Sequence, residues 1–180
     1  GALFLEGSKV RIRSFHDAVA HGIGMIHQEL NLCPNLNVAE NIFVAREITR
    51  GRVHIDHKAQ LEKAQSFLDR LQADIDPKAE VANLRIGQQQ IVEIAKALAL
   101  DTRILIMDEP TSALSTAEVE VLFKVISDLK RAGVSIIYIS HRLEELLKIG
   151  DYITVLRDGN LVQSARIKDI DVPWIISNMV

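Results

Sequence analysis

The chain has 180 residues, of which 48% are hydrophobic and 25% charged, and its formal net charge is -3. This length suits one domain with a proper core and is short for two. No cluster of Lys and Arg builds a one-sided basic face, so the charge pattern gives no sign of nucleic-acid or anionic-lipid binding. The apolar runs fall below the ~18 residues that span a bilayer. The single cysteine, Cys33, cannot form an internal disulfide, which fits a reducing compartment.

Residues 2–7 and 9–12 are short alternating segments joined by Gly7-Ser8, which predicts a β-hairpin. Residues 22–28 are predicted to form a third strand that ends in Gln28. The segment 31–49 is predicted to begin as a loop and to continue as a helix over 38–47. The chain therefore opens with an antiparallel portion, followed by a strand and a helix.

Two amphipathic helices are predicted in the middle of the chain. Asp56 is expected to cap the first, and Pro77 ends that region. The second covers residues 88–100, where the apolar positions 91, 94, 95 and 98 recur at the spacing of a helix that lies on a sheet. The first helix has its apolar face at Leu61, Ala64, Leu68 and Leu71.

The last third alternates strands with helices. The run 103–107 is apolar on both faces, as expected of an inner parallel strand covered by helices on each side. Ser115 and Glu118 form a capping box that opens a helix, which Gly133 stops. A buried strand over 134–140, a helix over 141–148 and a hairpin turned at Asp158-Gly159 follow. This pattern predicts an α/β fold with a largely parallel central sheet.

Two acids, Asp108 and Glu109, follow the inner strand directly. Ligands of parallel sheets bind beyond the carboxyl ends of the strands. One acid could organise a hydrated Mg²⁺ while the other orients a water that attacks a phosphoryl group. An isolated pair of this kind is more often a solvated strand end that leads to a helix cap, so the interpretation depends on the other motifs.

Five motifs occur in a fixed order, and together they resemble the ATP-binding subunit of ABC transporters over nearly the whole chain. "HQE" places Gln28 at the Q-loop position, and "LRIGQQQ" stands at the signature motif. "ILIMDEP" resembles the Walker B strand with its glutamate, "SALS" the D-loop, and "ISHR" places His141 at the switch histidine. The stretches "GIGMIHQELNLCPNLNVAENIFVARE" and "IGQQQIVEIAKAL" resemble the first nucleotide-binding half of ATPases that drive ribose-, galactose- and xylose-type importers, in which one polypeptide carries two such halves.

The resemblance implies a role for each matching residue. Asp108 would hold Mg²⁺ through water, and Gln28 would contact the Mg²⁺ or the lytic water. Glu109 would act as general base, and His141 would hydrogen-bond the γ-phosphate. The start of the signature helix, with Gly87 and Gln88, would offer backbone N–H groups to a γ-phosphate bound on the opposite half. The dimer seam would be lined by Ser112, Ala113, Leu114 and Ser115.

Two features depart from the family pattern. Arg85 stands where the signature usually has serine, and it either replaces the serine as a charged donor or turns to solvent and weakens the half-site. No G-x-x-x-x-G-K-[ST] occurs, so the loop that cradles phosphates is missing. We therefore expect an N-terminally truncated piece that binds ATP poorly by itself and does not hydrolyse it. The missing loop would follow a strand beside 103–107, and its loss would leave a sheet edge open to self-association.

The expected fold is thus a P-loop NTPase-like ABC ATPase domain without the P-loop strand. Its helical and signature subdomain would cover about residues 28–100, and its catalytic core 101–180. The resemblance implies Mg²⁺ and ATP in the complete protein, with none bound to this chain. It implies as partners the second nucleotide-binding half, membrane subunits that meet the region from Gln28 to the signature and, indirectly, a periplasmic sugar-binding protein. The expected location is the cytoplasmic face of the cell membrane.

Two other classes remain as alternatives. One is a soluble ABC-type ATPase of DNA repair or translation. Those of the repair type carry a long coiled coil between the Q-loop and the signature, and no sustained heptad pattern occurs between Gln28 and Leu84. A non-catalytic interaction or regulatory module on the same scaffold would suit Arg85 and the missing loop. Such a module would not need Asp108, Glu109 and His141.

Overall fold

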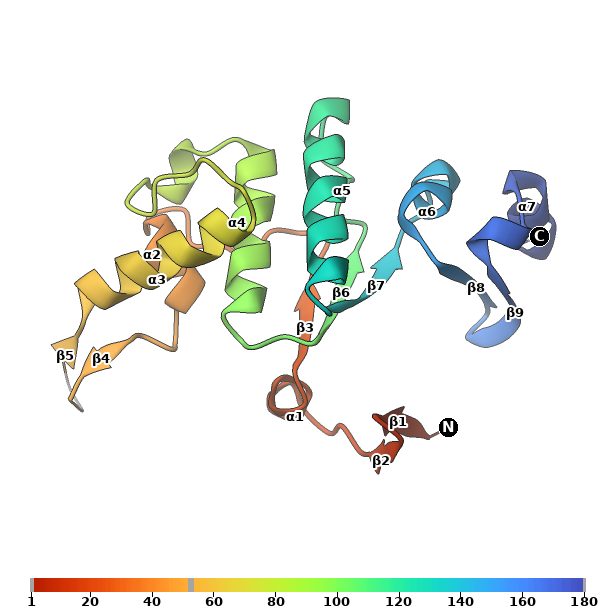
Figure 1. The fold of residues 1–180 in the computed structure, drawn as a ribbon, viewed down its shortest axis with the longest axis horizontal. Helices are drawn as coiled ribbons and strands as arrows, with labels where there is room; N and C mark the ends of the chain where they lie inside the picture. Colours follow the sequence, from red (N-terminus) through yellow and green to blue (C-terminus); the bar gives the residue numbers. More distant parts are fainter. Residues whose placement is uncertain (1, 52–53, 180) are drawn as a thin grey trace.

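A computed structural model describes residues 2–51 and 54–179. Its centre is a parallel sheet of three strands in the order β3 (Ile23–Ile26), β6 (Ile104–Asp108) and β7 (Ser135–Ile139) (Figure 1). Ile26 is aligned with Met107, and Met107 with Tyr138. The inner position predicted for residues 103–107 is confirmed, because β6 pairs with a strand on each edge.

The two faces of this sheet have different surroundings. Leu105 and Met107 are 0% exposed and belong to the same core as α4 (Ile86–Leu98) and α5 (Thr116–Arg131). On the opposite face Met25, Ile137 and Ile139 are 38%, 51% and 46% exposed. The prediction that helices cover both faces was therefore wrong for the described residues, since the two long helices that contact the sheet share one face.

Local sequence chemistry fixes the ends of α5. The Ser115 hydroxyl oxygen accepts from the Glu118 N–H, and the Glu118 carboxylate accepts from the Ser115 N–H at 2.9 Å, so the predicted capping box is present. After the helix ends at Arg131, Gly133 adopts a φ of 87°, a conformation that glycine reaches without steric cost. The predicted stop is confirmed.

A helical region lies beside the sheet, at the left of Figure 1. It contains α2 (Val38–Phe43), the short strands β4 (Thr49–Arg50) and β5 (His54–Ile55), α3 (His57–Arg70) and a 3-10 turn, Val81–Asn83. Asp56 caps α3 as predicted, with a side-chain oxygen that accepts from the Ala59 N–H. α2 ends four residues before its predicted end, because Ala45 adopts a φ of 62° that no helix continues. A subdomain boundary near residue 100 remains a prediction.

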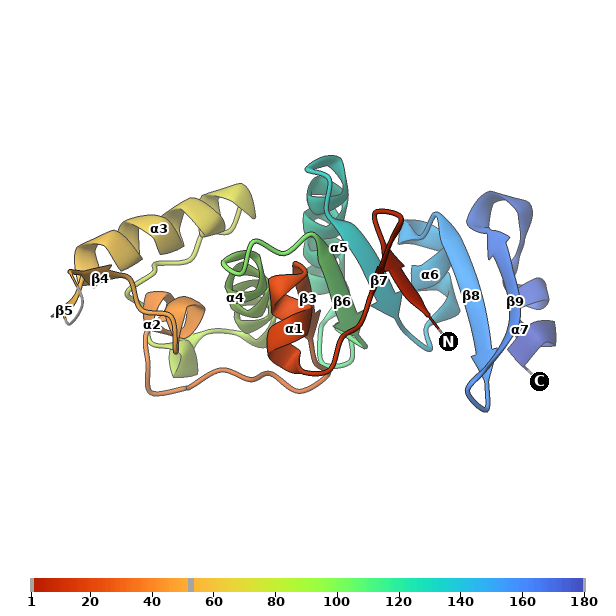
Figure 2. The ribbon, with the colours of Figure 1, turned by 90° about the horizontal axis from the view of Figure 1, so that it is seen from below.

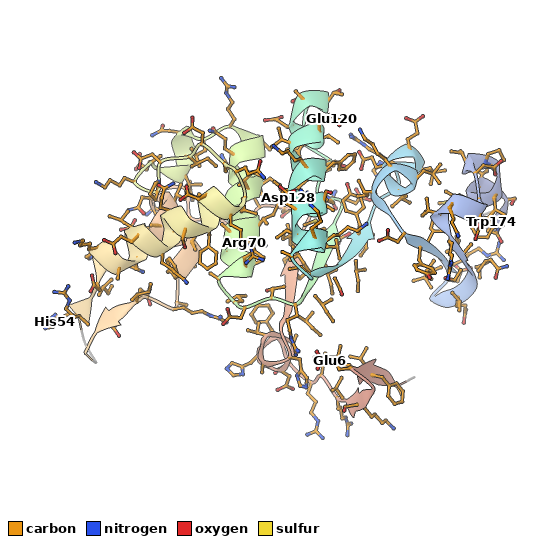
Figure 3. The ribbon with its side chains drawn as sticks, viewed as in Figure 1. Glu6, His54, Arg70, Glu120, Asp128 and Trp174 are labelled. Carbon is orange, nitrogen blue, oxygen red and sulfur yellow. The ribbon has the colours of Figure 1, made fainter. Side chains whose placement is uncertain are left out.

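Two antiparallel hairpins with fully described turns lie outside the central sheet, in addition to the pair of β4 and β5. β1 (Leu3–Leu5) and β2 (Ser8–Val10) are joined through Glu6 and Gly7, one residue earlier than predicted. β8 (Tyr152–Arg157) and β9 (Asn160–Arg166) turn at Asp158-Gly159, as predicted. Both central residues of each turn have positive φ, the geometry of tight hairpins that match strand twist. Glu6 also reaches from the first hairpin to Arg103 at 2.6 Å (Figure 3).

Two further helices were not predicted, and another begins at a different residue than predicted. α1 (Phe15–Ala20), capped by the Ser14 hydroxyl, was not predicted. α7 (Val172–Met179), which follows the 3-10 turn Ile167–Asp169, was not predicted either, and its buried residue is Ile175. α6 (Leu143–Ile149) begins two residues later than predicted. Within residues 2–51 and 54–179, no helix combines the length and apolarity that crossing a bilayer requires.

An apolar groove of about 1030 Å³ is lined by residues of β7 and β8. Figure 2 shows these two strands with α6 between them. Within the described residues, β7 pairs with β6 along one edge and has no strand along the other. Both edges of β6 are occupied, so the expectation of a missing strand beside β6 was wrong. The open edge belongs to β7. Several helices and strands contribute apolar side chains to the lining of this groove. They include Ile126, Leu146, Ile153, Val155, Ile175 and Met179.

Candidate functional site

The carboxyl ends of the three parallel strands meet at one edge of the sheet. Asp108 is the last residue of β6, Glu109 follows it, and His141 lies two residues beyond β7. His141 Nδ1 is 3.0 Å from Glu109 Oε1. The structure thus brings together two residues that are 32 positions apart in the chain and that the sequence motifs placed in one site.

The backbone of Glu109 directs its carboxylate toward His141. Its N–H donates to the Ile139 carbonyl at 2.9 Å, and its own carbonyl accepts from the Ser112 N–H at 3.1 Å. Between these bonds Glu109 has a φ of 45°, in the left-handed region. That conformation costs a non-glycine residue about 1–3 kcal/mol and persists only where neighbours fix it. The chain turns sharply here, directly after the strand.

The pair has the chemistry of an oriented base. In the tautomer with the proton on Nδ1, His141 donates to Glu109 and keeps Nε2 available for a ligand. The His141 side chain is 68% exposed and that of Glu109 29%, so a substrate could reach both. A carboxylate can accept a proton from an attacking water, and a protonated imidazole can donate to a phosphate oxygen.

Asp108 and Gln28 lie at the same edge of the sheet, and among the described residues neither side chain hydrogen-bonds to this pair. Asp108 is half-buried, and in the described part of the chain its carboxylate has no hydrogen bond or ion pair. Gln28 is exposed two residues after β3. Because Ile26 is level with Met107, both side chains belong to the carboxyl-end edge. Across residues 2–51 and 54–179, no set of three His, Cys, Asp or Glu side chains forms a metal site.

The signature residues form the first turn of α4. Arg85 precedes the helix and is exposed, and its N–H donates to Gln88 Oε1 at 3.1 Å. The Gly87 N–H donates to Glu118 Oε1 at 3.1 Å. A Cβ on Gly87 would lie 2.6 Å from that oxygen, so this contact requires glycine. The first turn of α4 is thereby joined to the start of α5.

The D-loop residues continue from Glu109 to α5. Ser112 is exposed, whereas Leu114 is half-buried against the core and its N–H donates to the Thr111 carbonyl at 3.2 Å. Ser115 donates to Glu118 through both its N–H and its hydroxyl. The Ser112 N–H donates to the Glu109 carbonyl, so the backbone joins this loop to the pair of Glu109 and His141.

One buried polar network was missed by the sequence reasoning. Glu145 is 8% exposed, and its carboxylate accepts from Thr111 Oγ1 at 2.9 Å, Tyr138 Oη at 2.8 Å and Arg142 Nη1 at 3.2 Å. Burial raises the pKa of Tyr138 above its usual range, and the hydrogen bond to Glu145 raises that pKa further. The network ties the D-loop to β7 and α6 on either side of His141.

The irregular segment after Gln28 is also fixed by side chains. The Asn31 N–H donates to Glu93 Oε1 at 2.7 Å, and Lys96 Nζ donates to the Asn31 carbonyl at 2.8 Å. Asn41 is 0% exposed and accepts from the Cys33 N–H at 2.7 Å. Its amide nitrogen donates to the carbonyls of Cys33, Leu36 and Asn37. Residues 31–37 are thus held against α4 and α2.

Comparisons with known proteins place the chain in a family. The family model described as "ABC transporter" matches residues 1–112. The ribose import ATP-binding protein RbsA of Rhodopirellula baltica is 51% identical over 180 residues, all of this chain and 35% of that protein. A putative ribose/galactose/methyl galactoside import ATP-binding protein of Agrobacterium fabrum is 50% identical over the same share of each chain. The chain spans about a third of the length of these curated relatives.

Solved structures show the same fold. An ATP-binding cassette of an ABC transporter in its ADP conformation aligns with a TM-score of 0.81, at 22% identity, over 97% of this chain and 74% of that chain. A cassette described as a dimer in a post-hydrolysis state, bound to ADP and Pi, aligns with a TM-score of 0.73 at 23% identity. The alignment covers 93% of this chain and 73% of that chain. The fold is that of an ATP-binding cassette. The chain belongs to the ABC transporter family, which confirms the resemblance of the motifs.

Proposed function

We propose that the whole protein is the ATP-hydrolysing subunit of an ABC importer for monosaccharides, and that this chain is part of its first nucleotide-binding half. The observation that carries the proposal is the contact between His141 and Glu109 at the carboxyl end of the sheet. The names of the relatives that are 51% and 50% identical support the sugar class. Which monosaccharide is imported lies outside the proposal.

In this proposal Glu109 accepts the proton of the attacking water, and His141 holds Glu109 in place and donates to the γ-phosphate. Asp108 fits a Mg²⁺ site, because its carboxylate is unpaired within the described residues and oxygen ligands suit that ion. Gln28 would approach the same ion or the water from β3. Bound Mg²⁺ would neutralise charge on the phosphates.

The phosphate-binding loop must come from residues other than these 180, since no G-x-x-x-x-G-K-[ST] occurs in them. We infer that its strand pairs with the open edge of β7. The Ser135 N–H donates to the Arg103 carbonyl, so the alternate residues Ile136 and Tyr138 direct their backbone groups to the opposite edge. The apolar groove along that edge offers a place for the strand and for the helix that would follow it.

Calorimetry tests this inference on the 180-residue chain. Without the loop, we expect no binding of Mg-ATP at micromolar concentrations, because most phosphate contacts are missing. The full-length protein is the matched control and should bind. Micromolar affinity of the 180-residue chain would contradict the inference that a phosphate-binding segment outside these residues pairs with the open edge of β7.

ATPase measurements on the full-length protein test the catalytic roles. Glu109→Gln should lower kcat by about a hundredfold or more, because the amide cannot take a proton. His141→Ala should also lower kcat, whereas Glu144→Gln, an exposed change in α6, should leave it unchanged. A full-length protein that binds Mg-ATP but shows no ATPase activity above the Glu109→Gln variant would favour the non-catalytic module instead.

The partners and location follow from the same proposal. They are a second nucleotide-binding half, membrane subunits that contact the region from Gln28 to α4, and a periplasmic sugar-binding protein that acts through those subunits. The protein would lie on the cytoplasmic face of the membrane. Copurification of the full-length protein with its membrane subunits tests this assembly, and a chain that never associates with them would contradict it.

A further inference from the structure

Glu118 joins two segments that the proposed function places at the seam between nucleotide-binding halves. One carboxylate oxygen accepts from the Gly87 N–H at 3.1 Å. The other accepts from the Ser115 N–H at 2.9 Å and the Ser115 hydroxyl at 2.7 Å. A single side chain therefore links the first turn of α4 with the loop that precedes α5, across 31 residues of sequence.

The contact between Gly87 and Glu118 depends on the identity of both residues. The Glu118 side chain fills the space where any larger residue would place its Cβ, with three of its atoms 2.6–2.8 Å from that position. The hydrogen bonds from Ser115 and Gly87, together with the charge of Arg85, lower the pKa of Glu118. The carboxylate is thus ionised at neutral pH and stays an acceptor.

An amide has one hydrogen, so the Gly87 N–H cannot serve Glu118 and a phosphate oxygen fully at the same time. The two acceptors are also both anionic, and like charges this close repel each other. On the proposed function, the Gly87 N–H faces a γ-phosphate bound to the opposite half. Glu118 holds the place that this phosphate oxygen would take.

We propose that Glu118 is a positioning residue that occupies the Gly87 N–H in the free protein and must leave it when a phosphate of the opposite half arrives. The other oxygen of the same carboxylate accepts from the Ser115 N–H and hydroxyl, so movement of Glu118 would also shift its contacts with the loop 112–115. Arg85, at the serine position of the signature, then keeps a positive charge beside the incoming phosphate. This inference rests on the proposed function for the identity of the phosphate. The hydrogen bond between Gly87 and Glu118 is observed independently of that function.

The first experiment tests the contact alone, by NMR on the 180-residue chain. In Glu118→Ala the Gly87 amide should exchange with solvent about tenfold faster or more, because a hydrogen bond to a charged acceptor is lost. Glu118→Gln should shift the Gly87 amide proton upfield while largely keeping the protection. Glu120→Gln is the matched control on α5, where Figure 3 labels this residue. Glu120 pairs with Lys148 and, among the described residues, has no ion pair with α4. An unchanged Gly87 amide in Glu118→Ala would overturn the inference.

The second experiment tests displacement, in the full-length protein. With the negative charge removed, Glu118→Gln should lower the Mg-ATP concentration for half-maximal ATPase activity by about three- to tenfold, while Glu120→Gln leaves it unchanged. An equal or higher concentration in Glu118→Gln would show that Glu118 is a fixed structural link. Absence of ATPase activity in the unsubstituted protein would refute the proposed function and leave the NMR result standing.

Discussion

The two faces of the central sheet are built from similar apolar residues but meet different surroundings. Leu105 and Met107 lie under the long helices α4 and α5 and are 0% exposed. On the other face Ile137 and Ile139 remain about half exposed, next to the groove between β7 and β8. Burial rather than residue type therefore decides which positions stabilise this chain. The exposed face has the composition of a surface that another segment covers.

The largest expected effect is on the covered face. Leu105→Ala should lower the free energy of unfolding by about 2–5 kcal/mol, because it removes a fully buried side chain and leaves a cavity. Ile137→Ala on the uncovered face should cost less than about 1 kcal/mol. Denaturant titration followed by circular dichroism measures both. Equal losses would mean that the uncovered face is buried in solution.

A smaller effect is expected in the buried network beside His141. Glu145→Ala should lower the free energy of unfolding by about 1–3 kcal/mol, because Thr111, Tyr138 and Arg142 lose their shared acceptor. The neighbouring exposed residue provides the control, and Glu144→Ala should stay within about 0.5 kcal/mol. A reversed ranking of the two variants would show that the Glu145 network does not contribute to stability.

On the uncovered face the main consequence should be association rather than stability. Ile137→Asp places a charge beside the open edge of β7, so it should reduce self-association of the chain at high concentration. Its unfolding free energy should change by less than about 1 kcal/mol. Light scattering across a concentration series, with Ile137→Val as the apolar control, measures this. A chain that is monomeric at every concentration would refute the association.

The mildest effect concerns Tyr138 and emerges only at high pH. Burial raises the pKa of its phenol, so the neutral form is favoured in the fold. The resulting stability is complete below the usual value of 10.0 and is lost as the pH rises toward the raised value. In Tyr152→Phe, which leaves Tyr138 as the only phenol, absorbance titration should show ionisation well above pH 10. Ionisation near pH 10 in a folded sample would contradict the burial of Tyr138.

Features that depend on a few adjacent residues could be predicted from the sequence. The capping box of Ser115 with Glu118 and the turn at Asp158-Gly159 are local chemistry and are present in the structure. The early end of α2 could not be foreseen, because alanine rarely adopts the positive φ of Ala45. The helices α1 and α7 were missed, since α1 has no buried residue and α7 has one.

The sequence singled out the residues of the candidate site but did not indicate their connections. Asp108, Glu109 and His141 were proposed because their motifs occur in a fixed order, and in the structure the parallel strands bring Glu109 and His141 together. The contacts of Glu118 with Gly87 and of Glu145 with Thr111 join residues 31 and 34 positions apart. Neither motif order nor periodicity indicates which of several neighbouring acids turns toward the interior. These two contacts could therefore be identified only from the three-dimensional structure.

The anchoring of residues 31–37 has a mechanical consequence. This segment has no regular secondary structure, yet the Asn41 amide and the bonds of Asn31 to Glu93 and Lys96 fix it to α2 and α4. A stiff connection has little conformational entropy left to lose, so it transmits a displacement instead of absorbing it. A displacement that begins at Gln28 would therefore be passed on to α4 and would not be absorbed within residues 31–37.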